Sequence, residues 1–157
     1  MSAPSSAPQD TPKPAPWHAA FPKPSSSGSL EFISAEELHS LILHEPAPAQ
    51  RSFTVIDVRR TDFENRCIRG AINLPAHSIY PTLPGLVPLL ERSPLLIFHC
   101  NSCSSPSSRG RLSAGWVQDA LDDAGVSRET CRVKVLEGGI KGWVEKYGEE
   151  AEVTVSL

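Results

Sequence analysis

The sequence predicts a single α/β domain with a mainly parallel central sheet and helices on both faces. Short apolar runs alternate with segments of helical periodicity along most of the chain. Polar residues follow two of these runs directly, as expected at the C-terminal ends of buried parallel strands, where ligands bind. The 157 residues suffice for one domain with length left for a tail, and 39% apolar residues suffice for a core.

The predicted elements begin near residue 30. Ser34 and Glu37 have the spacing of a capping box, and an apolar stripe at 38, 41 and 42 continues the helix until prolines 46 and 48 end it. The other predicted elements are a strand at 53–58, a short element at 68–75, a helical turn at 86–90, a strand at 95–99, a helix at 111–124, a strand at 133–136 and a helix at 140–147.

Both ends of the chain are predicted to be tails, at 1–29 and 151–157, around a domain at 30–150. Residues 1–29 consist mostly of Pro, Ser and Ala and hold seven of the fifteen prolines, a composition typical of disorder. Trp17 and Phe21 are two large aromatic residues in this polar stretch. They leave open whether the stretch is an inert tail or a latch onto the domain.

Charge and composition exclude several function classes. A net charge of −3 leaves no basic face for nucleic acid, and no apolar run approaches the ~20 residues that span a bilayer. We therefore expect neither nucleic-acid nor membrane partners. The start of the chain has no apolar signal-peptide core, and its first 29 residues contain no arginine, so neither a secretory signal nor a transit peptide is expected.

The four cysteines of a chain without an export signal predict a reducing compartment, the cytoplasm or the nucleus. Cys100 and Cys103 have the spacing of half a zinc ribbon, but no second ligand pair accompanies them. Cys67 and Cys131 are isolated and are expected to be small buried residues. The sequence therefore predicts no metal site and no cofactor.

The segment from His99 to Gly110 is the candidate site. It follows the 95–99 strand and leads into a helix, so loop amides and the helix N-terminus converge and form a cradle for an anion. A cysteine in such a cradle is held as the nucleophilic thiolate. Cys103 and Arg109 have the Cys-x5-Arg spacing of cysteine-dependent phosphatases, in which the guanidinium clamps two oxygens of a tetrahedral oxyanion.

The other candidate residues would support this cradle. Asp57 is the nearest acid and a candidate substrate-binding residue, expected to bind the loop backbone or Arg59 rather than to act as a general acid. Asp62 is expected to be solvated. The small residues that let the loop amides approach a substrate are Ser104, Ser105, Ser107, Ser108 and Gly110.

Three segments resemble those of the rhodanese-like domain family, over roughly 33–147. They are VIDVR at 55–59, IRGAINLP at 68–75 and VLEGGIKGW at 135–143. Segments 75–82 and 108–116 look like fungal members close to yeast-type arsenate reductases and the rhodanese-fold dual-specificity phosphatases. The resemblance implies a rhodanese-like fold and a cysteine nucleophile in the loop.

Either Cys100 or Cys103 could be the nucleophile. The family's nucleophile follows the strand at once, which indicates Cys100, but eight residues then separate it from Arg109. The thiolate must lie about 3–4 Å from the atom that it attacks, so loop length constrains the chemistry more than the strand end does, and this favours Cys103. The other cysteine could close a disulfide that protects the nucleophile or resolves an adduct.

The predicted activity is transfer at a tetrahedral oxyanion, as in a phosphatase or an arsenate reductase. The predicted partner is an oxyanion or a phosphorylated substrate, and a thiol reductant is needed only for the arsenate route. Two alternatives stay open. One is sulfur transfer from thiosulfate through a cysteine persulfide, which normally uses a shorter loop. The other is a rhodanese-like module that binds an anion without turnover.

Overall fold

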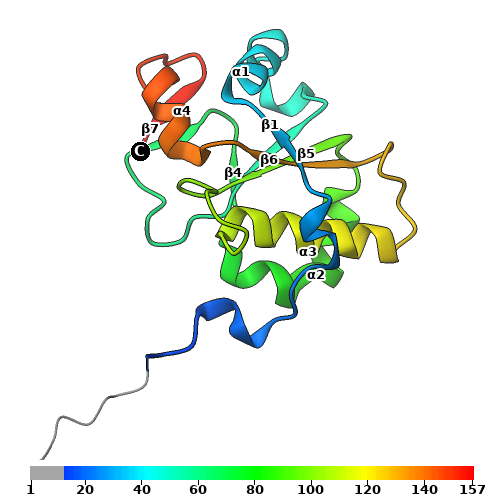
Figure 1. Ribbon diagram of the computed structural model, residues 1–157. Helices are drawn as coiled ribbons and strands as arrows, with labels where there is room; N and C mark the ends of the chain where they lie inside the picture. Colours follow the sequence, from blue (N-terminus) through cyan, green and yellow to red (C-terminus); the bar gives the residue numbers. More distant parts are fainter. Residues whose placement is uncertain (1–12) are drawn as a thin grey trace, which may run out of the picture.

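The computed structural model describes residues 13–157, which form a central five-stranded sheet with helices on both faces (Figure 1). The sheet order is β1-β6-β5-β2-β4, and every neighbouring pair is parallel. The predicted α/β class is therefore confirmed. The strands are β1 (Glu31–Ile33), β2 (Thr54–Asp57), β4 (Ile72–Asn73), β5 (Leu95–His99) and β6 (Arg132–Leu136).

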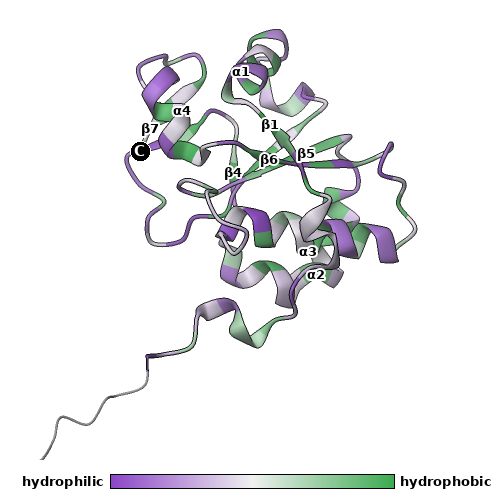
Figure 2. Cartoon of the chain, viewed as in Figure 1, coloured by the Kyte–Doolittle hydropathy of each residue, from purple (hydrophilic) through white to green (hydrophobic). Residues whose placement is uncertain are grey.

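Two pairs of helices cover the sheet. On one face lie α1 (Ala35–His44) and α4 (Gly139–Tyr147), and on the other lie α2 (Ala76–Leu90) and α3 (Arg109–Asp123) (Figure 1). Figure 2 shows hydrophobic residues along the strands and mixed polar and apolar faces on the helices, as expected where helices bury one face only. No helix of the described part of the chain is long and apolar enough to cross a membrane.

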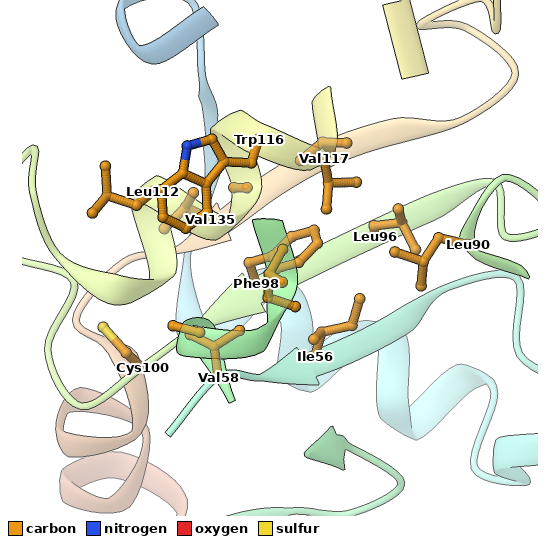
Figure 3. Packing of buried hydrophobic residues seen from close by; sticks show 14 of the residues in the cluster. Ile56, Val58, Leu90, Leu96, Phe98, Cys100, Leu112, Trp116, Val117 and Val135 are labelled. Carbon is orange, nitrogen blue, oxygen red and sulfur yellow. The ribbon is translucent and has the colours of Figure 1, made fainter. Parts of the chain in front are cut away.

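Strand β5 lies at the centre of the sheet and contributes to both halves of the core. Its side chains alternate, so Leu96 and Phe98 pack beneath α2 and α3 whereas Ile97 packs beneath α1 and α4. Figure 3 shows Phe98 between Ile56 of the neighbouring strand and the apolar face of α3. Because β5 is packed on both faces, it fixes the position of Cys100, the residue that directly follows the strand.

Helix α2 is longer than the 86–90 turn that the sequence predicts, which corrects that prediction. It contains Pro81, Pro84 and Pro88, and each proline removes one backbone hydrogen bond from the helix. All three prolines are exposed on the outer face, where water can satisfy the freed carbonyl groups. The inner face packs on the core through Ile79 and Leu90.

The chain end is a strand, so the predicted C-terminal tail at 151–157 is wrong. Strand β7 (Thr154–Ser156) pairs antiparallel with β3 (Arg66–Ile68). Trp143 of α4 donates a hydrogen bond of 2.9 Å from Nε1 to the hydroxyl of Thr154, and both residues are buried. This pairing could not be predicted from the short strands, because each is specified by its distant partner.

Residues 17–29 pack on the domain, which corrects the prediction of a disordered tail for this stretch, whereas residues 13–16 are exposed and residues 1–12 lie outside the described part. The segment contains two short 3-10 helices, η1 (Trp17–Ala20) and η2 (Ser25–Gly28). Trp17 and Phe21 meet Trp116 of α3 edge-on, with ring centroids 5.9 and 5.6 Å apart. The Trp116 indole also donates a 2.8 Å hydrogen bond to the Pro22 carbonyl.

Polar contacts fix the second half of this segment. The carboxylate of Asp119 accepts hydrogen bonds from the amides of Ser25 and Ser26, at 2.7 and 3.0 Å. Gly115 of α3 faces the Pro24 ring so closely that an added Cβ would lie 2.6 Å from the Cβ of Pro24. The segment thus behaves as a latch over α3, the alternative that the sequence had left open.

Candidate active site

Cys100 leaves the end of β5 at a point that the N-terminus of α4 anchors. The amide of Ile140 donates a 3.0 Å hydrogen bond to the Cys100 carbonyl, and the amide of Lys141 donates a 2.9 Å bond to the Asn101 carbonyl. Gly139 has a φ of 57°, and a Cβ there would collide with the Asn101 carbonyl oxygen. Because Gly139 has no side chain, α4 can approach the start of the loop closely enough to make these two hydrogen bonds, which hold its backbone in place.

The far end of the loop joins α3 beside the same sulfur atoms. Gly110 is the second residue of α3 and is buried. An added Cβ at Gly110 would lie 2.5 Å from the sulfur of Cys103. The predicted role of Gly110 as a small residue at the cradle is thus consistent with the close approach of the helix backbone to a thiol. Figure 3 shows Cys100 at the end of β5, with its sulfur on the side of the loop that leads into α3.

The sulfur atoms of Cys100 and Cys103 lie 3.2 Å apart. Each residue is only 3% exposed. The Cys103 backbone is in the left-handed region, with φ of 53°, and this turn brings its sulfur to 3.3 Å from the amide of Cys100. The structure therefore joins the two candidate nucleophiles into one pair beneath the loop.

The two thiols of this pair differ in acidity. The hydrogen bond from the Cys103 thiol lowers the pKa of Cys100 to about 5, against the effect of burial. Backbone amides of Gly110 and Cys103 and the charge of Arg109 lower that pKa further. The same sulfur–sulfur hydrogen bond and burial raise the pKa of Cys103. The contact between the two sulfur atoms therefore favours one thiolate and one thiol in the pair, with Cys100 as the more acidic residue.

Arg109 begins α3 and pairs with Asp62, a residue 47 positions earlier in the chain. Its two terminal nitrogens each lie 2.7 Å from one oxygen of the Asp62 carboxylate. This two-point pairing holds the pKa of Asp62 well below its usual range. The Asp62 side chain is 41% exposed, as the prediction of a solvated residue implies, but its carboxylate also binds the Arg109 guanidinium at two points, which the sequence did not predict.

Asp57 is fully buried, and its carboxylate is bound by the guanidinium of Arg59. Arg59 donates to its two oxygens from Nε at 3.0 and 3.1 Å and from Nη2 at 2.8 Å, and His99 Nε2 lies 3.6 Å away. Asp57 therefore fixes the strand end, as the expected pairing with Arg59 implies. A direct part in substrate binding, the wider role assigned to Asp57 from the sequence, does not fit this arrangement.

The loop serines mostly bond to one another. The hydroxyls of Ser102 and Ser104 lie 3.2 Å apart, and those of Ser105 and Ser107 lie 3.5 Å apart. Ser108 differs, because its buried hydroxyl oxygen has no hydrogen-bond partner among the described residues. A free hydroxyl beside Arg109 and the start of α3 is suited to an anion.

Arg111 and His77 are further residues at this loop that the sequence did not assign to it. Arg111 donates a 2.9 Å hydrogen bond from Nε to the Cys103 carbonyl, and its guanidinium lies 4.9 Å from the centre of the Phe32 ring. The His77 ring packs against Trp17 at a tilt of 34°, with 4.5 Å between the ring centroids, and burial lowers the pKa of His77. No local pattern marks either residue, because their partners lie far away in the chain.

Comparison with known proteins places the chain in a family. The model of the rhodanese-like domain matches residues 34–146. The chain belongs to the rhodanese-like domain family. It is 32% identical over 133 residues to the CDC25-like phosphatase YCH1 of Saccharomyces cerevisiae, covering 76% of this chain and 80% of that protein.

Solved structures agree with this assignment. The structure of Ygr203w, a yeast protein tyrosine phosphatase of the rhodanese family, superposes with a TM-score of 0.68 at 26% identity, covering 80% of this chain and 92% of that one. The As-Sb reductase of Leishmania major superposes with a TM-score of 0.66 at 24% identity, covering 81% and 92%, which shows the shared fold. The relatives named phosphatases support an enzyme of this general class.

Proposed function

We propose that this protein is a cysteine-dependent phosphatase in which Cys100 is the nucleophile and Arg109 binds the phosphoryl oxygens. The observation that carries this proposal is the position of Cys100 directly after β5, with its sulfur 3.2 Å from that of Cys103 and the start of α3 beside the pair. Loop spacing favoured Cys103. Three features support Cys100 instead: its place directly after the strand, its lowered pKa and the raised pKa of Cys103.

The reaction begins when an oxyanion replaces Asp62 on the guanidinium of Arg109. The Cys100 thiolate attacks phosphorus, the new S–P bond forms, and the bond from phosphorus to the leaving oxygen breaks. Arg109 and the amides at the start of α3 stabilise the charge that develops on the phosphoryl oxygens. Water then attacks the phosphocysteine, breaks the S–P bond and releases phosphate, which restores the thiolate.

A paired assay tests the proposal on wild type, Cys100→Ser and Cys103→Ser. Each protein is assayed for aryl phosphate hydrolysis and for cyanide-dependent sulfur transfer from thiosulfate. We expect Cys100→Ser to reduce hydrolysis to background, because a serine hydroxyl is not ionised at neutral pH, whereas Cys103→Ser retains measurable hydrolysis. Cys131→Ser is the matched control, since its thiol is buried beside the Leu90 carbonyl outside the loop.

Other results would change the conclusion. If only Cys103→Ser loses hydrolysis, the nucleophile is Cys103, as the Cys-x5-Arg spacing predicts. Sulfur transfer without phosphate hydrolysis would favour a sulfurtransferase with an enlarged loop. If wild type catalyses neither reaction but still binds oxyanions, the protein is a binding module.

The pH dependence of alkylation tests the thiolate directly. Since the Cys100 pKa is lowered to about 5, the thiolate fraction falls about tenfold per pH unit below that value and is constant above it. We expect the rate of Cys100 modification by iodoacetamide, followed by peptide mass, to be flat from pH 6 to 8 and to fall below pH 5. In Cys103→Ala the midpoint should rise, because the first cause of the lowered pKa is removed. A midpoint near the ordinary cysteine value in wild type would contradict the assignment.

A further inference from the structure

An apolar cavity that the phosphatase reaction does not use lies beside the catalytic loop. Its volume is about 460 Å³, within the range of small-molecule sites, and apolar side chains make up most of its wall. One side of the cavity belongs to the latch, residues 17–29, and the other side belongs to the loop and α3. The lining side chains that bear on its function are Phe21 and Pro22 of the latch, Pro106 and Ser107 of the loop, and Leu112 and Trp116 of α3.

Contacts within the protein hold the two sides of this cavity together. The Trp116 indole uses its single N–H in the 2.8 Å hydrogen bond to the Pro22 carbonyl, which leaves the rest of its ring as apolar surface. Phe21 meets that ring edge-on, and the Ser26 hydroxyl donates a 3.1 Å hydrogen bond to the Gly115 carbonyl. A site that is already formed before a ligand arrives loses less conformational freedom on binding. The cavity therefore has the rigidity of a binding site.

One face of α3 joins the cavity to the residues that would bind the phosphoryl group. Ser108, which caps α3, is followed at intervals of four residues by Leu112 and Trp116, so the three lie along one side of the helix. Figure 3 shows Leu112 and Trp116 next to each other. Ser108 carries the unpartnered hydroxyl beside Arg109, and its carbonyl accepts a 2.9 Å hydrogen bond from the Leu112 amide. Because the organic group of a phosphate ester is attached directly to a phosphoryl oxygen, a phosphoryl group at Arg109 would place that group beside the cavity.

We propose that this cavity binds the aromatic group of an aryl phosphate monoester, and that Phe21 and Trp116 select such substrates. The inference rests on the proposed function in one respect, namely that the phosphoryl group occupies the loop at Arg109. The wall of the cavity presents flat rings, those of Phe21, Trp116 and two prolines, against which an aromatic ring packs favourably. An alkyl phosphate would leave the cavity unfilled. The latch precedes the family's domain, which begins at residue 34, so this selectivity comes from a segment outside that domain.

Binding of phosphonates tests the proposal, because a phosphonate has no leaving group whose acidity could account for a difference. Methylphosphonate, benzylphosphonate and 1-naphthylmethylphosphonate share the oxyanion but differ in the ring, and calorimetry measures the Kd of each for the full chain. We expect the naphthyl compound to bind at least about tenfold more tightly than methylphosphonate, because its rings bury apolar surface in the cavity. Cyclohexylmethylphosphonate, which has an apolar ring that is not flat, should bind more weakly than benzylphosphonate.

Two variants change the cavity and a third is the matched control. Ala19 is exposed and lines the cavity, so Ala19→Trp fills the cavity without disturbing the core and should abolish the preference for a ring. Phe21→Ala removes one aromatic wall and should reduce the preference about fivefold. Both variants should keep the methylphosphonate Kd within about twofold. Ser26→Ala removes the bond from the latch to Gly115 but does not line the cavity, so it should keep the wild-type preference.

Hydrolysis assigns the source of the ring. Naphthyl phosphate and a tyrosine-phosphorylated peptide both carry an aryl phosphate, and the one whose kcat/KM falls more in Ala19→Trp is the kind of substrate that the cavity serves. The proposal is overturned if all the phosphonates bind wild type with equal Kd, if the cyclohexyl compound matches benzylphosphonate, or if Ala19→Trp binds the naphthyl compound as tightly as wild type. Ring-dependent binding by a protein that hydrolyses no phosphate would leave this inference standing and overturn the phosphatase assignment.

Discussion

Arg109→Lys is expected to lower kcat/KM for aryl phosphate hydrolysis by about 10²–10³-fold, the usual cost of removing one donor from a site that stabilises developing charge. Arg109 offers a planar fork that already binds both oxygens of Asp62 at 2.7 Å. Lysine would keep the positive charge but offer only a point contact, so it could not hold two phosphoryl oxygens in the geometry of the transition state. Steady-state kinetics measures the loss.

Arg128→Lys is the matched control for this prediction. Arg128 also binds a carboxylate through two nitrogens, at 3.2 and 2.8 Å from the oxygens of Asp122, but on the exposed surface beyond α3. Its replacement should leave kcat/KM within about twofold, because exposed ion pairs contribute at most ~1 kcal/mol to stability. Equal kinetics for wild type and Arg109→Lys would show that Arg109 only anchors Asp62.

Gly139→Ala is expected to lower kcat/KM for aryl phosphate hydrolysis by at least about 10²-fold. The substitution acts only by displacing the backbone, and a displacement of about 1 Å at a reacting group has a cost of that size. The substitution touches no reacting atom. The new Cβ would collide with the Asn101 carbonyl and lie 2.8 Å from the Cys100 carbonyl oxygen, in a backbone with φ of 57°. The loop must then shift away from α4, which carries Cys100 with it.

Gly142→Ala tests whether the loss comes from that collision. Gly142 lies on the same helix, and its added Cβ would meet only the Glu137 carbonyl oxygen, at an ordinary 3.9 Å. We expect this variant to keep wild-type kinetics and thermal stability, whereas Gly139→Ala loses about 1–3 kcal/mol of unfolding free energy in thermal or denaturant unfolding. Similar kinetics for the two variants would argue against an anchored loop.

Much of the fold follows from local patterns in the sequence. The apolar run at 95–99 predicted β5 to the residue, and Ser34 caps α1 through the predicted box with Glu37. Helices α3 and α4 began within two residues of their predicted starts. These signals are local because strand and helix periodicity and helix capping depend on neighbours within a few positions.

Where local propensity and tertiary packing disagree, packing determined the result. Proline is unfavourable inside a helix, yet α2 contains three, all of them exposed, and its inner face packs on the core. The composition of residues 1–29 predicted disorder, but aromatic and carboxylate contacts with α3 hold residues 17–29 on the domain. Both outcomes depend on partners that no window of neighbouring residues contains.

Some features of the candidate site follow from the local sequence, and others arise only when the chain folds. The sequence by itself determined the strand–loop–helix cradle, its two cysteines and Arg109, because all of them lie within one short segment. Only the tertiary structure paired Arg109 with Asp62, anchored the loop on α4 and placed Cys103 against Cys100 so that one thiol donates to the other. The acidity of a thiol depends on what surrounds it in space, and the chain brings those groups together only when it folds.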